Sequence, residues 1–169
     1  MYVDSVLKIL LITGSFTKRA QIPFRAWLPA AIAAPTPVSS LVHSSTLVTA
    51  GVYLIFRHFY EAGDTAESFI VMVIGLSTIT LASLSALNEK DIKKMVALST
   101  LSQLGLIILS IGTGWVFIAF FHLVTHAFFK AIIFIRVGNI IHSRQLYQSI
   151  KNTGMILFSS PFNSSTIIL

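Results

Sequence analysis

Long apolar runs separated by short polar breaks dominate the sequence. Residues 38–56, 68–88 and 95–129 contain no Lys, Arg, Asp or Glu. The third run is interrupted by Gly112-Thr113-Gly114, which permits a tight reversal of the chain. Because about 20 apolar residues cross a bilayer as one helix, the pattern predicts four membrane-spanning helices between residues 38 and 135.

Weaker apolar segments precede and follow these four spans. The predicted fold is therefore an all-α membrane protein of about five to six transmembrane helices, forming one transmembrane unit over residues 1–169. In chain order, the predicted elements are a broken helix over 1–34, helices over 36–57, 68–88, 94–112 and 115–142, and an incomplete helix over 151–169.

Proline residues are concentrated near the start of the chain. Four of the five prolines are Pro23, Pro29, Pro35 and Pro37. Proline removes a backbone donor and clashes with the preceding turn, so we expect the first helix to be discontinuous between Lys18 and Pro29. The backbone polar groups that such a break frees are tolerated in a membrane only against protein or a water-filled cavity.

The composition and the placement of charge also indicate a membrane protein. Only 11% of the residues are charged and 54% are hydrophobic, whereas soluble domains average about 25% charged residues. The net charge of +6 would suggest a nucleic-acid partner for a soluble protein. However, predicted loops on one side (18–37, 88–94, 136–151) hold nine Lys or Arg, and those on the other (57–67, 112–114) hold only Arg57. This positive-inside asymmetry indicates a lipid bilayer as the partner rather than nucleic acid.

His122, His126 and Lys130 follow one another at four-residue spacing in one predicted span. Such residues share a helix face and lie about 6 Å apart along the axis, which suits a hydrogen-bonded relay bridged by water. An ammonium group inside the membrane costs about 2.5–3.5 kcal/mol. Lys130, and Lys18 at the break in the first helix, are therefore candidate functional residues.

Other interpretations of these residues stay open. Buried histidines and lysines can simply link helices by hydrogen bonds, and a lysine near a helix end can extend to the interface. A metal ion bound to His122 and His126 would be repelled by Lys130 and has no evident third ligand. All six acidic residues lie at the N-terminus or in loops, and no Ser-His-acid set or glycine-rich phosphate loop is present. The chain has no cysteine, which excludes disulfides, iron–sulfur clusters and zinc–thiolate sites within it.

Three long segments carry a family resemblance. They cover residues 18–57 (KRAQIPFRAWLPAAIAAPTPVSSLVHSSTLVTAGVYLIFR), 91–106 (DIKKMVALSTLSQLGL) and 122–134 (HLVTHAFFKAIIF). In this order they closely resemble the chain 5 family of mitochondrial NADH–ubiquinone oxidoreductase, respiratory complex I. The resemblance extends over nearly the whole chain from about residue 10. It implies a central fragment of an antiporter-like helix bundle, related to subunits of multi-chain sodium/proton antiporters.

The resemblance also implies functional roles. Lys18 matches the family's lysine on the first broken helix, His43 matches the histidine that passes protons onward, and Lys130, with His126 one turn before it, matches the central lysine. His122 extends this relay by one further turn. The implied function is proton translocation in the membrane arm, in the mitochondrial inner membrane, beside other membrane-arm subunits. No cofactor is expected in this chain, and NADH, FMN, iron–sulfur clusters and ubiquinone are expected in other subunits. The alternatives are a non-pumping structural fragment of the membrane arm and a subunit of a sodium/proton antiporter.

Overall fold

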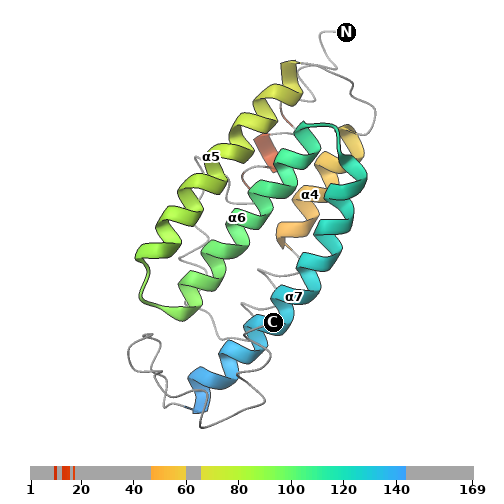
Figure 1. Cartoon of the computed structure of the whole chain (residues 1–169). Helices are drawn as coiled ribbons and strands as arrows, with labels where there is room; N and C mark the ends of the chain where they lie inside the picture. Colours follow the sequence, from red (N-terminus) through yellow and green to blue (C-terminus); the bar gives the residue numbers. More distant parts are fainter. Residues whose placement is uncertain (1–9, 11–12, 16, 18–46, 60–65, 144–169) are drawn as a thin grey trace.

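The computed structural model describes residues 10, 13–15, 17, 47–59 and 66–143 (Figure 1). Within these ranges the chain forms the helices α4 (Leu47–Phe59), α5 (Ala66–Asn88), α6 (Ile92–Gly112) and α7 (Val116–Ser143). Helices α5, α6 and α7 run alternately up and down and lie side by side, and α4 packs near the first half of α7 (Figure 1). The predicted all-α fold is confirmed for the part of the chain that the structure describes.

Three of these helices are long and apolar enough to cross a membrane, namely Ser68–Asn88, Ile92–Gly112 and Val116–Asn139. They correspond to the predicted spans 68–88, 94–112 and 115–142, and α4 corresponds to the second half of the predicted helix 36–57. The predicted break in the first helix and the predicted incomplete helix over 151–169 lie outside the described residues.

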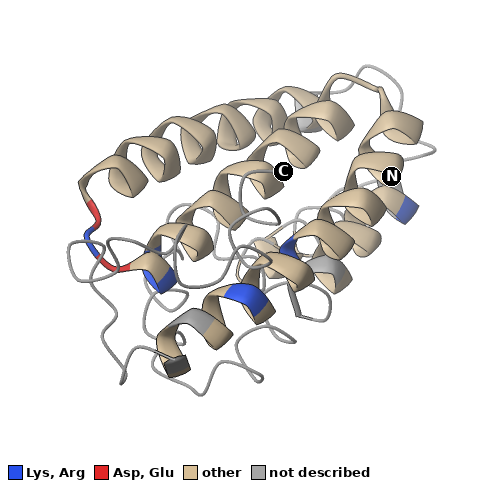
Figure 2. Ribbon diagram, turned by 60° about the horizontal axis from the view of Figure 1, so that its bottom comes forward, with Lys and Arg blue, Asp and Glu red and all other residues tan. Residues whose placement is uncertain are grey.

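A short charged connection joins α5 to α6, and acidic residues gather there (Figure 2). Helix α6 begins at Ile92, two residues earlier than the sequence predicts, so Lys93 and Lys94 belong to its first turn. Positive charge at a helix N-terminus opposes the helix dipole. Asp91, the residue before the helix, offsets this effect. Its Oδ2 forms an ion pair with Lys94 Nζ at 3.3 Å.

The reversal between α6 and α7 has the hydrogen bonds of a Schellman motif. The N–H of Trp115 donates to the carbonyl of Ser110, and the N–H of Gly114 donates to the carbonyl of Ile111, both at 3.0 Å. Gly114 has φ +84°, a left-handed conformation in which a side chain is strained. The expected tight reversal at residues 112–114 is therefore present, and Gly114 is the residue that it requires.

Helices α5 and α6 approach each other closely because glycines face the opposite helix. A Cβ built on Gly75 would lie 3.0 Å from the backbone nitrogen of Leu109, and one on Gly112 would lie 3.0 Å from that of Met72. A Cβ on Gly105 would lie 2.6 Å from Thr78 Oγ1. Small residues at such a crossing allow the van der Waals contact that drives helix association in lipid.

Helix α6 occupies the middle of the described bundle. In its most apolar stretch 56% of the helix is buried, compared with 22% in the corresponding stretch of α5 and 22% in that of α7. Two apolar clusters of buried side chains pack around it. The first joins all four helices and contains Val52, Ile55, Val71, Leu104, Ile107, Ile108, Ile111 and Ala119. The second joins the start of α6 to the last half of α7 and contains Val96, Ala97, Phe134, Val137 and Ile141. Between the clusters, α6 and α7 face each other across polar residues.

Candidate functional site

Lys130 forms the principal polar contact between α6 and α7. Its side chain is buried, with 9% exposed, and its Nζ donates a hydrogen bond to Ser99 Oγ at 2.7 Å. Neither α6 nor α7 contains Asp or Glu, so no carboxylate on these two helices faces the lysine. Among the described residues, the side chain of Lys130 is thus held in the interior by a neutral hydroxyl rather than by an ion pair.

Ser99 is oriented to accept this bond. Its own hydroxyl donates to the backbone carbonyl of Val96 at 2.7 Å, one turn earlier on α6. A serine hydroxyl has one proton and two lone pairs. Because the proton is directed to Val96, the lone pairs remain available to the Lys130 ammonium.

A second polar contact lies two turns away from the first along α7. His122 Nε2 is 3.1 Å from Gln103 Oε1, and both side chains are half-buried. The amide oxygen is an acceptor, so this arrangement corresponds to the imidazole tautomer that carries its proton on Nε2. Ser99 and Gln103 are four residues apart on α6, and the antiparallel helix α7 presents its basic residues to them in the reverse order.

His126 lies between these two contacts on α7 and is buried, with 7% exposed. Its ring and that of His122 are nearly parallel, at an interplanar angle of 13° and a centroid distance of 6.3 Å. This separation agrees with the step of about 6 Å that the spacing predicts. Within the described ranges, His126 Nε2 has no hydrogen-bond partner.

The contact between Lys130 and Ser99 lies about two helical turns inside the nearer end of each span. Lys130 is 14 residues beyond Val116, about 21 Å along the axis, and nine residues before its span ends at Asn139. Ser99 is seven residues beyond Ile92, about 10 Å into α6. With a hydrocarbon core of about 30 Å, both groups belong to its inner part. The geometry therefore favours an interior position for the Lys130 ammonium over extension to the interface.

The structure places three of the five predicted site residues together. His122, His126 and Lys130 lie in line on α7, and two of them contact α6. Lys18 and His43 lie outside the described residues, so their roles stay predictions. Among the described residues, no group of three or more His, Cys, Asp or Glu is placed to hold a metal ion.

Sequence reasoning did not identify Ser99 and Gln103 as site residues. Most Ser and Thr hydroxyls in the described helices donate to carbonyls three or four residues earlier, as serines in spans usually do. Ser99 donates a bond of the same kind and in addition accepts a hydrogen bond from Lys130 Nζ. The four-residue spacing of Ser99 and Gln103 places them on one face of α6, but it does not show which helix that face contacts.

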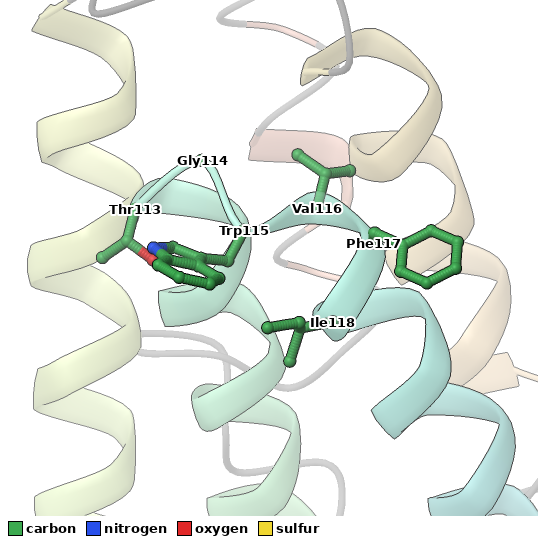
Figure 3. Close-up of a pocket in the computed structure, with 6 residues that line it drawn as sticks. All are labelled: Thr113, Gly114, Trp115, Val116, Phe117 and Ile118. Atoms are coloured by element: carbon green, nitrogen blue, oxygen red, sulfur yellow. The ribbon is translucent and has the colours of Figure 1, made fainter.

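A small open hollow of about 310 Å³ lies at the reversal between α6 and α7 and is lined by residues 113–118 (Figure 3). The indole of Trp115 lies beside Thr113, and the Phe117 ring points away from it (Figure 3). The lining carries no ionisable side chain. Trp115 is 64% exposed, as expected for an aromatic residue at a membrane interface, so we assign this hollow to the bilayer boundary and not to the polar site.

Apolar helices that enclose a line of buried basic side chains are typical of membrane proteins that move ions or protons. Comparison with known families identifies the particular family. The family model described as NADH:quinone oxidoreductase/Mrp antiporter, transmembrane, matches residues 3–169. The chain belongs to this family, and the predicted antiporter-like fold is confirmed.

The curated relatives support the same assignment. NADH-ubiquinone oxidoreductase chain 5 of Lumbricus terrestris is 48% identical over 163 residues, which are 95% of this chain and 28% of that protein. The chain 5 protein of Mytilus edulis is 54% identical over 146 residues, which are 86% of this chain and 26% of the relative. Among solved structures, a chain in the Mrp complex from Dietzia sp. matches with a TM-score of 0.76 and 38% identity, covering 79% of this chain and 15% of that one.

The resemblance to chain 5 that the three sequence segments indicate is thus confirmed. The chain spans less than a third of the length of these two curated relatives. Their animal origin and the three apolar helices agree with the prediction of a multi-pass protein of the mitochondrial inner membrane, and the chain is assigned there.

Proposed function

We propose that this chain forms part of the proton pathway in the membrane arm of an NADH:ubiquinone oxidoreductase. The observation that carries the proposal is the line of His122, His126 and Lys130 on α7, which lies between two apolar clusters, with His126 and Lys130 buried and His122 half-buried. Membership in the NADH:quinone oxidoreductase/Mrp antiporter family and the chain 5 relatives support it. A buried ammonium without an acidic partner on its own or the facing helix is costly, which argues for a function.

The three residues have the properties that proton transfer needs. Lys130 can release a proton and bind another, and imidazole can accept a proton on one nitrogen while it donates from the other. The ring separation of 6.3 Å is too long for a direct hydrogen bond between His122 and His126. A proton therefore passes between them through a small bridging donor and acceptor such as water.

The proposed pathway also includes two residues nearer the start of this chain and groups in other subunits. Lys18 would store a proton and His43 would relay it towards Lys130, as the chain 5 resemblance implies. This chain supplies proton-binding side chains and no redox group. NADH, FMN, iron–sulfur clusters and ubiquinone would be held by other subunits, whose electron transfer would drive the proton cycle. Other membrane-arm subunits are the proposed partners.

Replacement of Lys130 tests this proposal. The intact complex carrying Lys130→Ala is purified, reconstituted into liposomes and supplied with NADH and ubiquinone, and proton uptake is measured together with NADH oxidation. Since a positioned acid–base group contributes about 10²–10⁴-fold, we expect proton translocation to fall by at least about tenfold. Lys130→Met, which keeps an unbranched apolar stem, replaces the alanine variant if the latter does not assemble.

Lys94 provides a matched control because its side chain is 44% exposed and lies at the start of α6, away from the line. Lys94→Ala should leave proton uptake unchanged. An assembled complex that keeps wild-type proton uptake and turnover without Lys130 would contradict the proposal and favour a non-pumping structural role.

A second function, exchange of sodium for protons, is supported by the likeness to a chain of the Mrp complex. The two functions differ in their energy source. An antiporter would move protons in response to an imposed sodium gradient in the absence of NADH. Proton uptake that depends on NADH and is unaffected by the sodium gradient would favour the oxidoreductase.

A further inference from the structure

The contacts of α6 with α7 have a regular register. Gln103 meets His122 at 3.1 Å and Ser99 meets Lys130 at 2.7 Å, so two polar residues one turn apart on α6 face the two ends of the basic line. The apolar clusters close this polar zone on both sides, with Leu104 beyond Gln103 and Val96 before Ser99. Lys130 is therefore fixed relative to α6 at one point, the hydroxyl of Ser99.

The chemistry of this hydroxyl suits a partner whose proton comes and goes. When Lys130 carries its full set of protons, Nζ donates to a lone pair of Ser99 while the serine proton stays on the Val96 carbonyl. When Lys130 has lost a proton, its nitrogen gains a lone pair that can accept a hydrogen bond. Rotation of the serine O–H away from Val96 towards Nζ then keeps the two side chains bonded, and only the hydroxyl proton changes position.

We propose that Ser99 is a positioning residue for Lys130: it holds the side-chain nitrogen of the lysine at the contact between α6 and α7 in both protonation states by exchanging the roles of acceptor and donor. The inference rests on the proposed function, because it assigns a partner to a lysine of the proton pathway. Ser99 itself gains and loses no proton overall. A carboxylate at this position would bind only the charged form strongly, whereas a hydroxyl can bind both forms.

Three substitutions at one site separate hydrogen bonding from packing. Ser99→Ala removes the hydroxyl, Ser99→Cys keeps a side chain of similar size with a weak donor and acceptor, and Ser99→Thr keeps the hydroxyl. Loss of the bond should lower NADH-driven proton uptake by about tenfold in the alanine and cysteine variants. Tenfold corresponds to about 1.4 kcal/mol, a modest free energy for a hydrogen bond to a charged group. Ser99→Thr should retain most of the wild-type rate.

Ser102 is a matched control on the same helix. It is half-buried, and its hydroxyl donates to the carbonyl of Ser99 at 2.9 Å, within α6 itself. Ser102→Ala should therefore leave proton uptake within about twofold of wild type, since the lost bond lies inside α6 and holds neither Lys130 nor His122. All rates are measured on the intact reconstituted complex and are expressed per assembled complex.

A double variant connects Ser99 to Lys130. In a Lys130→Met background, Ser99→Ala should cause no further loss, because the two residues act as one unit. If Ser99→Ala and Ser99→Cys pump like wild type while Lys130→Met does not, the positioning role is refuted and the proposed function stands. If Lys130→Met also pumps normally, the proposed function itself fails. If Ser99→Thr is as impaired as Ser99→Ala, hydrogen bonding does not explain the effect and the inference is wrong.

Discussion

Enlarging Gly105 tests the close packing of α5 against α6. A Cβ at this position would lie 2.6 Å from Thr78 Oγ1, 2.8 Å from Ile79 Cγ1 and 3.1 Å from the carbonyl oxygen of Gly75. Two of these distances are shorter than any normal carbon contact, so Gly105→Ala requires the neighbouring atoms to move. The positions of Thr78 and of the α5 backbone determine how costly that movement is.

Thr78 cannot move aside freely. Its side chain is buried, with 1% exposed, and its hydroxyl donates to the Gly75 carbonyl at 2.8 Å. Rotation of Thr78 would break this bond, and separation of the helices would loosen the first apolar cluster. Overpacking of this kind costs about 1–3 kcal/mol, while alanine in a helix regains at most about 1 kcal/mol over glycine. Because two of the contacts would be shorter than 3.0 Å, we expect the cost to lie at the upper end of its range, which leaves a net destabilisation of about 1–2 kcal/mol.

The measurement is the half-life of NADH:ubiquinone reductase activity of the purified complex at a fixed elevated temperature. A loss of 1–2 kcal/mol is equivalent to a factor of about 5–30, so Gly105→Ala should shorten the half-life about fivefold or more. Thr78→Ala should partly restore it, because that change removes the atom in the closest contact. Gly14→Ala is the control, since a Cβ on Gly14 meets nothing within 4 Å. An unchanged half-life for Gly105→Ala would refute the close packing described above.

Two further predictions concern the ends of α6. Gly114→Ala should destabilise the complex by about 1–2 kcal/mol, because Gly114 has φ +84° and an L-residue is strained there; the same half-life assay measures the effect, and wild-type stability would show that the Schellman turn is not required. Asp91→Asn should change stability by less than about 1 kcal/mol, because its ion pair with Lys94 is partly exposed on both sides; a large loss of stability would show that this pair is desolvated in the assembled complex.

Much of the fold could be predicted from where charged residues are absent. The three longest charge-free runs gave the spans, because a bilayer excludes charge from about 20 consecutive residues, and Gly112-Thr113-Gly114 gave the reversal. The pattern could not show that α6 is the central helix. Its hydropathy of 1.8 is close to the 2.1 of α5 and the 1.9 of α7. In lipid, an apolar side chain is equally suited to a helix interface and to the membrane, so hydropathy alone does not separate the two.

The site could be predicted in part. Four-residue spacing placed His122, His126 and Lys130 on one face, and the parallel rings of the two histidines agree with that geometry. Their partners required knowledge of which helix faces α7 and in what register, which sequence spacing on one helix does not contain. Ser99 and Gln103 therefore emerge only when α6 and α7 are packed together. The bond of Lys130 to Ser99 holds the lysine side chain between α6 and α7 instead of letting it extend to an interface, and the position of the lysine in its span does not reveal this bond.

The position of Lys130 can be seen in a high-resolution density map of the intact complex in a lipid nanodisc. We expect Lys130 Nζ in the inner part of the bilayer, within hydrogen-bond distance of Ser99 Oγ, with ordered water connecting it to His126. A map in which the lysine nitrogen extends to the lipid headgroups, with dry apolar packing where α6 faces α7, would show that these residues form no proton pathway.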